Sequence, residues 1–234
     1  MTVASALLIA AVVLAVRLVP SLRFKAAVYS LPIPMTLALV GSGGHVDARH
    51  LLGVVMLVLF FVAVSVLHHR YGLHILLADG LALLAYLLLA WPLAALGRMP
   101  FLPTLVAVCG LWAITAARRP PAVPVEGTPP GRPGLLSVMV VVGTALLMAP
   151  LGGVLQSFVV TFPYSGVLVV VETRRSLPAF TRQFARASLA LVAFLAAYHF
   201  AEPYGRGWAL ATAWAAHLTT AGLLLATART TPAR

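Results

Sequence analysis

The chain has 234 residues, of which 62% are hydrophobic and only 9% are charged, and its formal net charge is +11. Soluble domains are about 45–50% apolar and about 25% charged, so this composition excludes an ordinary water-soluble globule. The basic residues lie between apolar runs rather than in an aromatic–basic RNA motif, which indicates a lipid bilayer as partner and no nucleic acid.

Apolar runs recur along the whole chain and predict an all-α integral membrane protein of about nine transmembrane helices. Several runs are shorter than the roughly 20 residues that a span needs, so tilted or re-entrant pieces stay open, above all where prolines occur. In chain order, the predicted segments are Val3–Pro20, Ala27–Gly43, His50–Leu67, Leu73–Leu96, Phe101–Ala117, Leu135–Met148, Val154–Val171, Ala187–Glu202 and Gly207–Ala228.

One stretch between these segments, Arg118–Gly134, is a linker, because its six prolines exclude a helix and a span alike. It divides the chain into a first four-span unit (1–100), a linking span with the Pro-rich linker (101–134) and a second four-span unit (135–234). The single cysteine, Cys109, allows no intrachain disulfide and no cysteine metal cluster.

The basic residues predict how the chain crosses the membrane. With nine spans, thirteen of the sixteen Lys and Arg residues fall on one side, and only Arg49, Arg98 and Arg206 fall on the other. By the positive-inside rule the side with thirteen is cytoplasmic. We therefore expect a bacterial-type inner (plasma) membrane protein with its N-terminus outside and its C-terminus in the cytoplasm.

A shift of 131 residues aligns the two units without a gap and places Pro32 on Pro163 and His68 on His199. Five predicted crossings separate the starts of the two units, and because five is odd the units would have opposite orientations. The basic loop accordingly follows the first span in the first unit and the second span in the second. The sequence thus predicts two inverted repeats, related by about a half turn around an axis in the membrane plane.

The stretch Gly152–Phe194 carries Phe-Pro at Phe162 and Pro163, then an apolar run, a short charged loop and an Ala-rich amphipathic approach to the next span. In these features it resembles the GlpM-like small four-span bacterial inner-membrane family and similar uncharacterised membrane proteins. The likeness is weaker in the first unit, where Leu31 stands in place of Phe162, and members of that family are single units. The resemblance implies a fused tandem of two units and no particular activity.

Asp79 and His217 are ionisable residues deep within predicted spans, where a charge costs roughly 2.5–3.5 kcal/mol on insertion scales. Asp79 is either a protonatable or cation-binding group facing a cavity, or an aspartate that is paired with a neighbouring Arg or His or caps a helix restart at Gly80. His217 either relays protons or, as is more common, forms an interhelical hydrogen bond.

Prolines interrupt two predicted spans, and each proline removes a backbone donor. Broken helices at a repeat interface commonly form transport sites, whereas a kink tolerated by neighbouring helices is the alternative. We expect Pro32, Pro163, Tyr164, Ser165 and Asp79 to converge on one polar cavity near mid-membrane. The predicted substrate or ion pathway comprises Pro32, Pro34, Asp79, Gln156, Thr161, Pro163, Tyr164, Ser165 and His217.

Polar residues at the predicted span ends form a second set of candidates, which we interpret as a gate. Glu172 with its neighbouring arginines is either such a gate, a contact for anionic lipid headgroups or an exposed ion-pair network. The gate candidates are His68, Glu172, Arg174, Arg175 and His199.

Sequence motifs for catalysis or metal binding do not occur. There is no HExxH, GxSxG or P-loop motif, and His69 and His74 are five residues apart rather than the three or four that stack ligands on a helix. We therefore predict no enzyme, no metal and no cofactor. The preferred function is a transporter or permease for an unknown small-molecule or lipid-like substrate, and coupling to protons stays open. A non-transporting scaffold or accessory subunit is the alternative, and homo-oligomerisation stays open.

Overall fold

The structure is a computed structural model that describes residues 31–42, 45–97, 99–117, 158, 160–163 and 166–229, and all regular structure in these ranges is helical. These ranges contain seven α-helices, and four stretches within them are long and apolar enough to cross a membrane. The prediction of an all-α, multi-pass membrane protein is confirmed at this level. The predicted segments Val3–Pro20 and Leu135–Met148 and the Pro-rich linker lie outside the described residues.

The first described helices are a short helix and a long hairpin. Helix α3 (Ile33–Ser42) leads into α4 (Ala48–His69), which Asp47 caps by accepting a hydrogen bond from Arg49 N at 3.0 Å. A tight turn then leads into α5 (Ile75–Ala95). Gly72 has a φ of +68° in this turn, a conformation that glycine adopts without strain.

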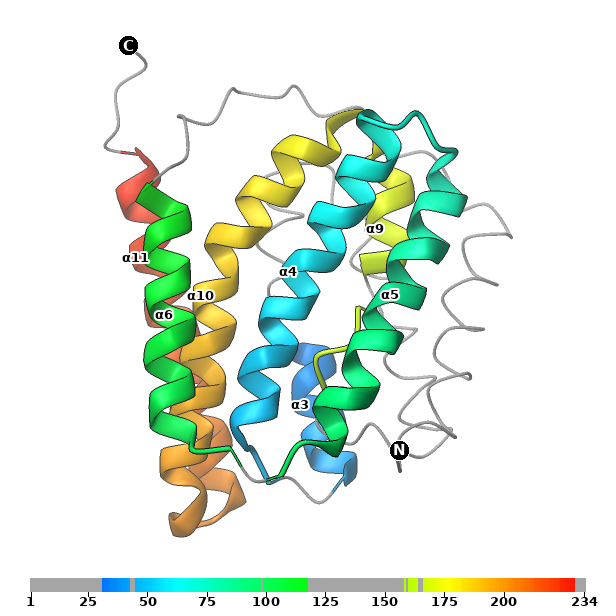
Figure 1. The fold of residues 1–234 in the computed structure, drawn as a ribbon. Coiled ribbons are helices and arrows are strands. Elements are labelled where there is room, and N and C mark those ends of the chain that lie inside the picture. The colour runs from blue at the N-terminus through cyan, green and yellow to red at the C-terminus, as the bar shows by residue number, and fades with distance from the viewer. Residues whose placement is uncertain are drawn as a thin grey trace.

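Helix α6 (Phe101–Ala117) follows with the bounds that the sequence predicts. It packs against α4 and α10, and Trp112 Nε1 donates a hydrogen bond of 3.0 Å to the Ala185 carbonyl. With 17 residues it is shorter than the four long stretches. It lies on the flank of the bundle in Figure 1.

The second half contains α9 (Gly166–Glu172), α10 (Leu177–Ala201) and α11 (Arg206–Arg229). The predicted start of the span at Ala187 is wrong, because α10 begins ten residues earlier. Pro178 lies in the first turn, where its missing N–H costs no helical hydrogen bond. Arg182 and Arg186, expected in a loop, therefore lie on a helix that buries Phe180 and Phe184 on its other face.

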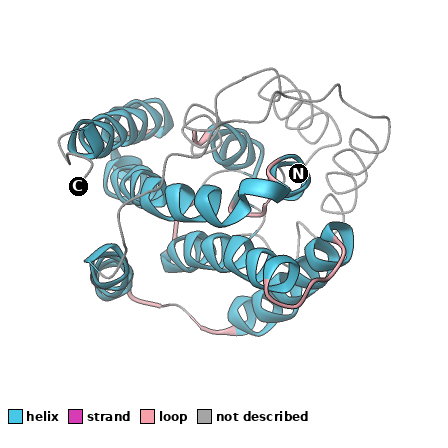
Figure 2. Ribbon diagram, turned by 90° about the horizontal axis from the view of Figure 1, so that it is seen from above, coloured by secondary structure: helices cyan, strands magenta, loops and turns pink. Residues whose placement is uncertain are grey.

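Helices α4 and α10 form an antiparallel pair at the centre of the bundle (Figure 1). Thr181 Oγ1, near the start of α10, lies 3.4 Å from the Phe61 carbonyl, late in α4. At the other end, His199 Nδ1 donates a hydrogen bond of 2.7 Å to the Val46 carbonyl. Helix α5 flanks α4 and α11 flanks α10, and Figure 2 shows the bundle from above, with short loops between its helices.

Candidate functional site

The helical path is interrupted between Phe158 and α9. Phe158 and Val160 are helical, Thr161 lies in a turn, Phe162 and Pro163 are not helical, and α9 begins at Gly166. Pro163 has no backbone N–H, and its carbonyl accepts a hydrogen bond of 3.2 Å from Val167 N. The break therefore falls at the proline that the sequence singles out, and we call the described residues 158, 160–163 and 166 the break segment.

The break segment packs tightly on α4 at two glycines. A Cβ atom at Gly53 would lie only 1.9 Å from Thr161 Oγ1, so no larger residue fits without movement. A Cβ atom at Gly166 would lie 3.1 Å from both the Phe60 and Phe61 rings. Thr161 is fully buried against this face. The two glycines thus let the interrupted backbone approach α4 directly.

Tyr86 connects α5 to the break segment through its hydroxyl and its ring. Its hydroxyl donates a hydrogen bond of 3.3 Å to the Phe158 carbonyl and lies 3.2 Å from Thr161 Oγ1, while its ring meets the Phe162 ring edge-on at 5.6 Å. The Phe158 carbonyl is one that a continuous helix would pair with a backbone N–H. Tyr86 therefore satisfies a polar group that the break exposes, as the apolar interior of a bilayer requires.

A cavity of about 30 Å³ lies beside the break segment. This is room for about one or two water molecules. Of the described residues that line it, Thr161 alone has a polar side chain. The lining comprises Leu31, Pro34, Met35, Leu57, Phe61, Val160, Thr161, Phe162, Pro163, Phe184 and Leu191. Three predicted pathway residues, Pro34, Thr161 and Pro163, therefore meet at one cavity.

Pro32 and Pro34 stand at the start of α3, as Pro163 stands before α9. Pro32 is buried, and its carbonyl accepts hydrogen bonds of 2.7 Å from both the backbone N and the Oγ1 of Thr36. Its neighbour Leu31 lines the cavity, whereas Pro32 is not among the lining residues. Two Pro-containing helix starts thus face the same small space.

Asp79 is 4% exposed on the buried face of α5, and its Oδ1 has no hydrogen-bond partner in the described part of the chain. It lies two turns before Tyr86 on that face, a distance of about 10 Å along the helix. It is not among the described residues that line the cavity. The carboxyl thus shares the buried face of α5 with Tyr86 but does not line the cavity.

His217 is 1% exposed in α11, and its Nδ1 donates a hydrogen bond of 3.1 Å to the Ala190 carbonyl of α10. Its place matches that of Tyr86, which lies 131 positions earlier. The other buried residues of α11, Ala209 and Ala213, likewise correspond to buried Ala78 and Ala82 of α5. Each flanking helix therefore presents two alanines and one polar aromatic side chain at equivalent positions.

The gate candidates divide between the two ends of the bundle. His68 closes α4, and its Nδ1 donates a hydrogen bond of 2.8 Å to the Leu73 carbonyl. Arg174 and Arg175 are exposed at this same end, where the chain turns from α9 into α10 (Figure 1). His199 lies at the opposite end, near the close of α10.

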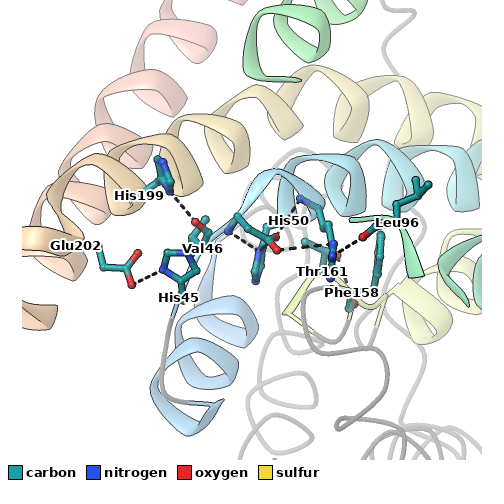
Figure 3. A network of polar contacts seen from close by, with 10 residues as sticks. His45, Val46, His50, Leu96, Phe158, Thr161, His199 and Glu202 are labelled. Carbon is teal, nitrogen blue, oxygen red and sulfur yellow. Dashed lines mark hydrogen bonds and ion pairs between the residues drawn. The ribbon is translucent and has the colours of Figure 1, made fainter. Parts of the chain in front are cut away.

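His199 belongs to a polar cluster that sequence reasoning missed (Figure 3). Glu202 Oε1 accepts a hydrogen bond of 2.9 Å from His45 Nδ1, next to the bond between His199 and Val46. The Phe101 ring stacks on His199 with a centroid distance of 3.7 Å. Among the residues that the structure describes, no group of three or more His, Cys, Asp or Glu side chains is arranged to hold a metal ion.

Three predicted residues, Gln156, Tyr164 and Ser165, lie outside the described residues, and Glu172 is described only as the last residue of α9. Tyr86, Gly53 and Glu202 contribute to the site or its surroundings without having been predicted. The repeat offset is the signal that could have found Tyr86, because it pairs this tyrosine with the singled-out His217.

Comparison with known proteins adds no relative: no family model, no curated protein and no solved structure matches the chain.

Proposed function

We propose that the chain is a multi-pass membrane transporter for a small apolar or lipid-like molecule, built from two inverted units. The observation that carries the proposal is the central cavity, whose lining comes from both halves of the chain. Leu31–Met35 and α4 contribute one side, and the break segment and α10 contribute the other. Substrate sites of transporters with inverted repeats lie at such a junction of discontinuous helices.

Helix bounds support the repeat. Shifted by 131 positions, the bounds 48–69 of α4 become 179–200, against Leu177–Ala201 for α10. The bounds 75–95 of α5 become 206–226, against Arg206–Arg229 for α11, and 33–42 of α3 become 164–173, against Gly166–Glu172 for α9. Because α4 and α10 run antiparallel, the correspondence favours inverted units over parallel ones (Figure 1).

The side chains that line the cavity narrow the class of substrate that it could bind. Apart from Thr161, the described side chains that line the cavity are apolar, so a charged solute would lose its hydration there without replacement. An apolar or lipid-like molecule with one hydroxyl or carbonyl for Thr161 fits this lining better. A volume of about 30 Å³ is too small for such a molecule, so under this proposal the two units separate to admit it.

Asp79 is proposed as the coupling group. A buried carboxylate is costly in a bilayer, and among the described residues Asp79 Oδ1 has no hydrogen-bond partner, so the side chain is suited to take up a proton or a monovalent cation. Tyr86, on the same face of α5, contacts the break segment directly. Occupation of Asp79 would thereby act on the same helix that positions Thr161.

The proposal that the cavity binds the substrate is tested with ligands and with a substitution that fills it. The purified chain is screened for lipids and apolar solutes that raise its melting temperature, and each hit is followed by uptake into proteoliposomes. Leu57→Phe, in the lining, should abolish the stabilisation and the uptake. Leu88→Phe, 65% exposed on α5, should leave both unchanged. Hits that stabilise both variants equally would place the ligand elsewhere, and folded protein that transports no hit would favour the scaffold alternative.

The coupling role is tested on a substrate so found. Asp79→Asn keeps the shape of a protonated carboxyl but cannot release a proton. We expect accumulation against a gradient to be lost while passive exchange of labelled substrate continues. Full accumulation by Asp79→Asn would remove this residue from the mechanism.

A further inference from the structure

The two ends of the bundle differ in how the halves of the chain are joined. At one end, the segment before α4 is hydrogen-bonded to the close of α10 through His199 with Val46 and through His45 with Glu202 (Figure 3). These two bonds connect residues more than 150 positions apart. They therefore hold together the two units of the proposed repeat.

Among the described residues, no corresponding bond joins the halves of the chain at the opposite end. A shift of 131 positions makes His68 the counterpart of His199 and Leu177 the counterpart of Val46. His68 Nδ1 instead donates to the Leu73 carbonyl of its own hairpin. The same histidine position thus joins the units at one end and stays within its unit at the other.

Aromatic packing strengthens this asymmetry. Phe101, at the start of α6, stacks on His199 at an interplanar angle of 13°. Helix α6 lies between the two proposed units in the chain. The His68 ring instead meets that of His69, its own neighbour on α4, at a centroid distance of 4.9 Å.

We propose that the bonds of His199 with Val46 and of His45 with Glu202 form a gate, which closes this end of the bundle and opens in an alternate state of the protein. This inference rests on the proposed inverted repeat. Alternating access in such proteins is largely rigid-body rocking of one unit against the other. Opening at the gated end should therefore bring the units together at the His68 end, with His68 turning toward the start of α10.

The gate is tested by distances between spin labels in the full chain, without any substrate. In a Cys109→Ser background, Leu96→Cys with Tyr204→Cys reports on the gated end, and Tyr71→Cys with Arg175→Cys reports on the other; all four positions are exposed. Glu202→Gln combined with His199→Phe should raise the ratio of long to short distances at the gated end about tenfold, equivalent to about 1.4 kcal/mol. The other pair should shift to shorter distances in the same samples.

Matched controls decide between gating and local loosening. His69→Phe, at an exposed position beside His68 that takes no part in the proposed change, should leave the distances at the gated end unchanged. Glu202→Gln alone, at a side chain that is 24% exposed, should show the same reciprocal shift in smaller measure and guards against misfolding of the double variant. Unchanged distances, or lengthening at the gated end without shortening at the other, would overturn the gate. Failure to find a transported substrate would overturn the proposed function and leave this result intact.

Discussion

The two Pro-containing helix starts, before α9 and at α3, differ in the size of the side chains that pack beside them. The break segment before α9 lies against α4 at Gly53, with Gly166 at the first position of the following helix. The positions that correspond to these glycines, 131 residues away, are Phe184 and Met35, which are large and line the cavity. These positions, related by the proposed repeat, thus carry minimal side chains beside the break segment and bulky ones beside the cavity. The difference indicates that close contacts of Gly53 with Thr161 and of Gly166 with the Phe60 and Phe61 rings hold the break segment in place, whereas space remains beside the start of α3.

The largest expected effect on stability comes from the bulky residues that line the cavity. Phe184 is 2% exposed and its ring lies 4.6 Å from that of Phe61, so Phe184→Ala should enlarge the cavity and lower the stability by about 3–5 kcal/mol. Phe200→Ala, at a position 56% exposed on the same helix, should cost far less. Thermal unfolding of the purified protein measures both. Equal losses would mean that Phe184 does not fill the junction.

On the close-packed side, Gly53→Ala should lower the stability by about 1–3 kcal/mol, because the new methyl group overlaps Thr161. Gly80→Ala, where a Cβ meets nothing within 4 Å, should be neutral or stabilising by about 0.5–1 kcal/mol. Adding Thr161→Gly to Gly53→Ala should return part of the loss. Independent, additive effects of these two substitutions would contradict the contact.

The flanking helices give a smaller contrast. Tyr86→Phe removes the hydroxyl that serves the Phe158 carbonyl and should cost about 1 kcal/mol. It should also speed alkylation of a cysteine placed at Thr161, because the break segment loses a restraint. His217→Phe, at the corresponding position of α11, should cost a similar amount and leave that alkylation rate unchanged, since its bond is to Ala190 of α10. Equal acceleration of the alkylation by both variants would show that Tyr86 does not specifically restrain the break segment.

The smallest expected effect concerns α6. Phe101→Leu keeps an apolar side chain but removes the stack on His199, which should cost about 0.5–1.5 kcal/mol. The same substitution in a His199→Phe background should cost a different amount, because the two residues touch. A double-mutant cycle on the unfolding free energy measures this coupling. A coupling of zero would mean that Phe101 of α6 does not stabilise His199 at the gated end.

Several helix bounds could be predicted from the residues that flank the apolar runs. Helix α6 has the predicted bounds, and α4, α5 and α11 differ from theirs by at most two residues at either end, because charged residues, glycines and prolines flank their apolar runs. The start of α10 was missed because its first ten residues are amphipathic, and their arginines concealed a helix that buries one face. The break at Pro163 was signalled by the proline itself, as far as the described residues reach.

Long-range partners could not be predicted in the same way. Nothing local in the sequence connects Gly53 with Thr161 or His45 with Glu202, since each pair is joined only by the packing of distant helices. Tyr86 was hidden in an apolar run, where an aromatic residue is usually core. The prediction that Asp79 shares a cavity with the prolines rested on the cost of a charge within a span, and spacing along one helix could not show which neighbours surround it.

The central claim, that the two units are inverted, is tested most directly by the sidedness of their equivalent loops. In intact cells with a Cys109→Ser background, single cysteines at Tyr71, between α4 and α5, and at Tyr204, between α10 and α11, are challenged with a membrane-impermeant maleimide. Both positions are exposed, 66% and 78% respectively. The inverted arrangement predicts that Tyr204→Cys is labelled from outside and that Tyr71→Cys is labelled only after the membrane is permeabilised. Labelling of both cysteines from the same side would contradict it.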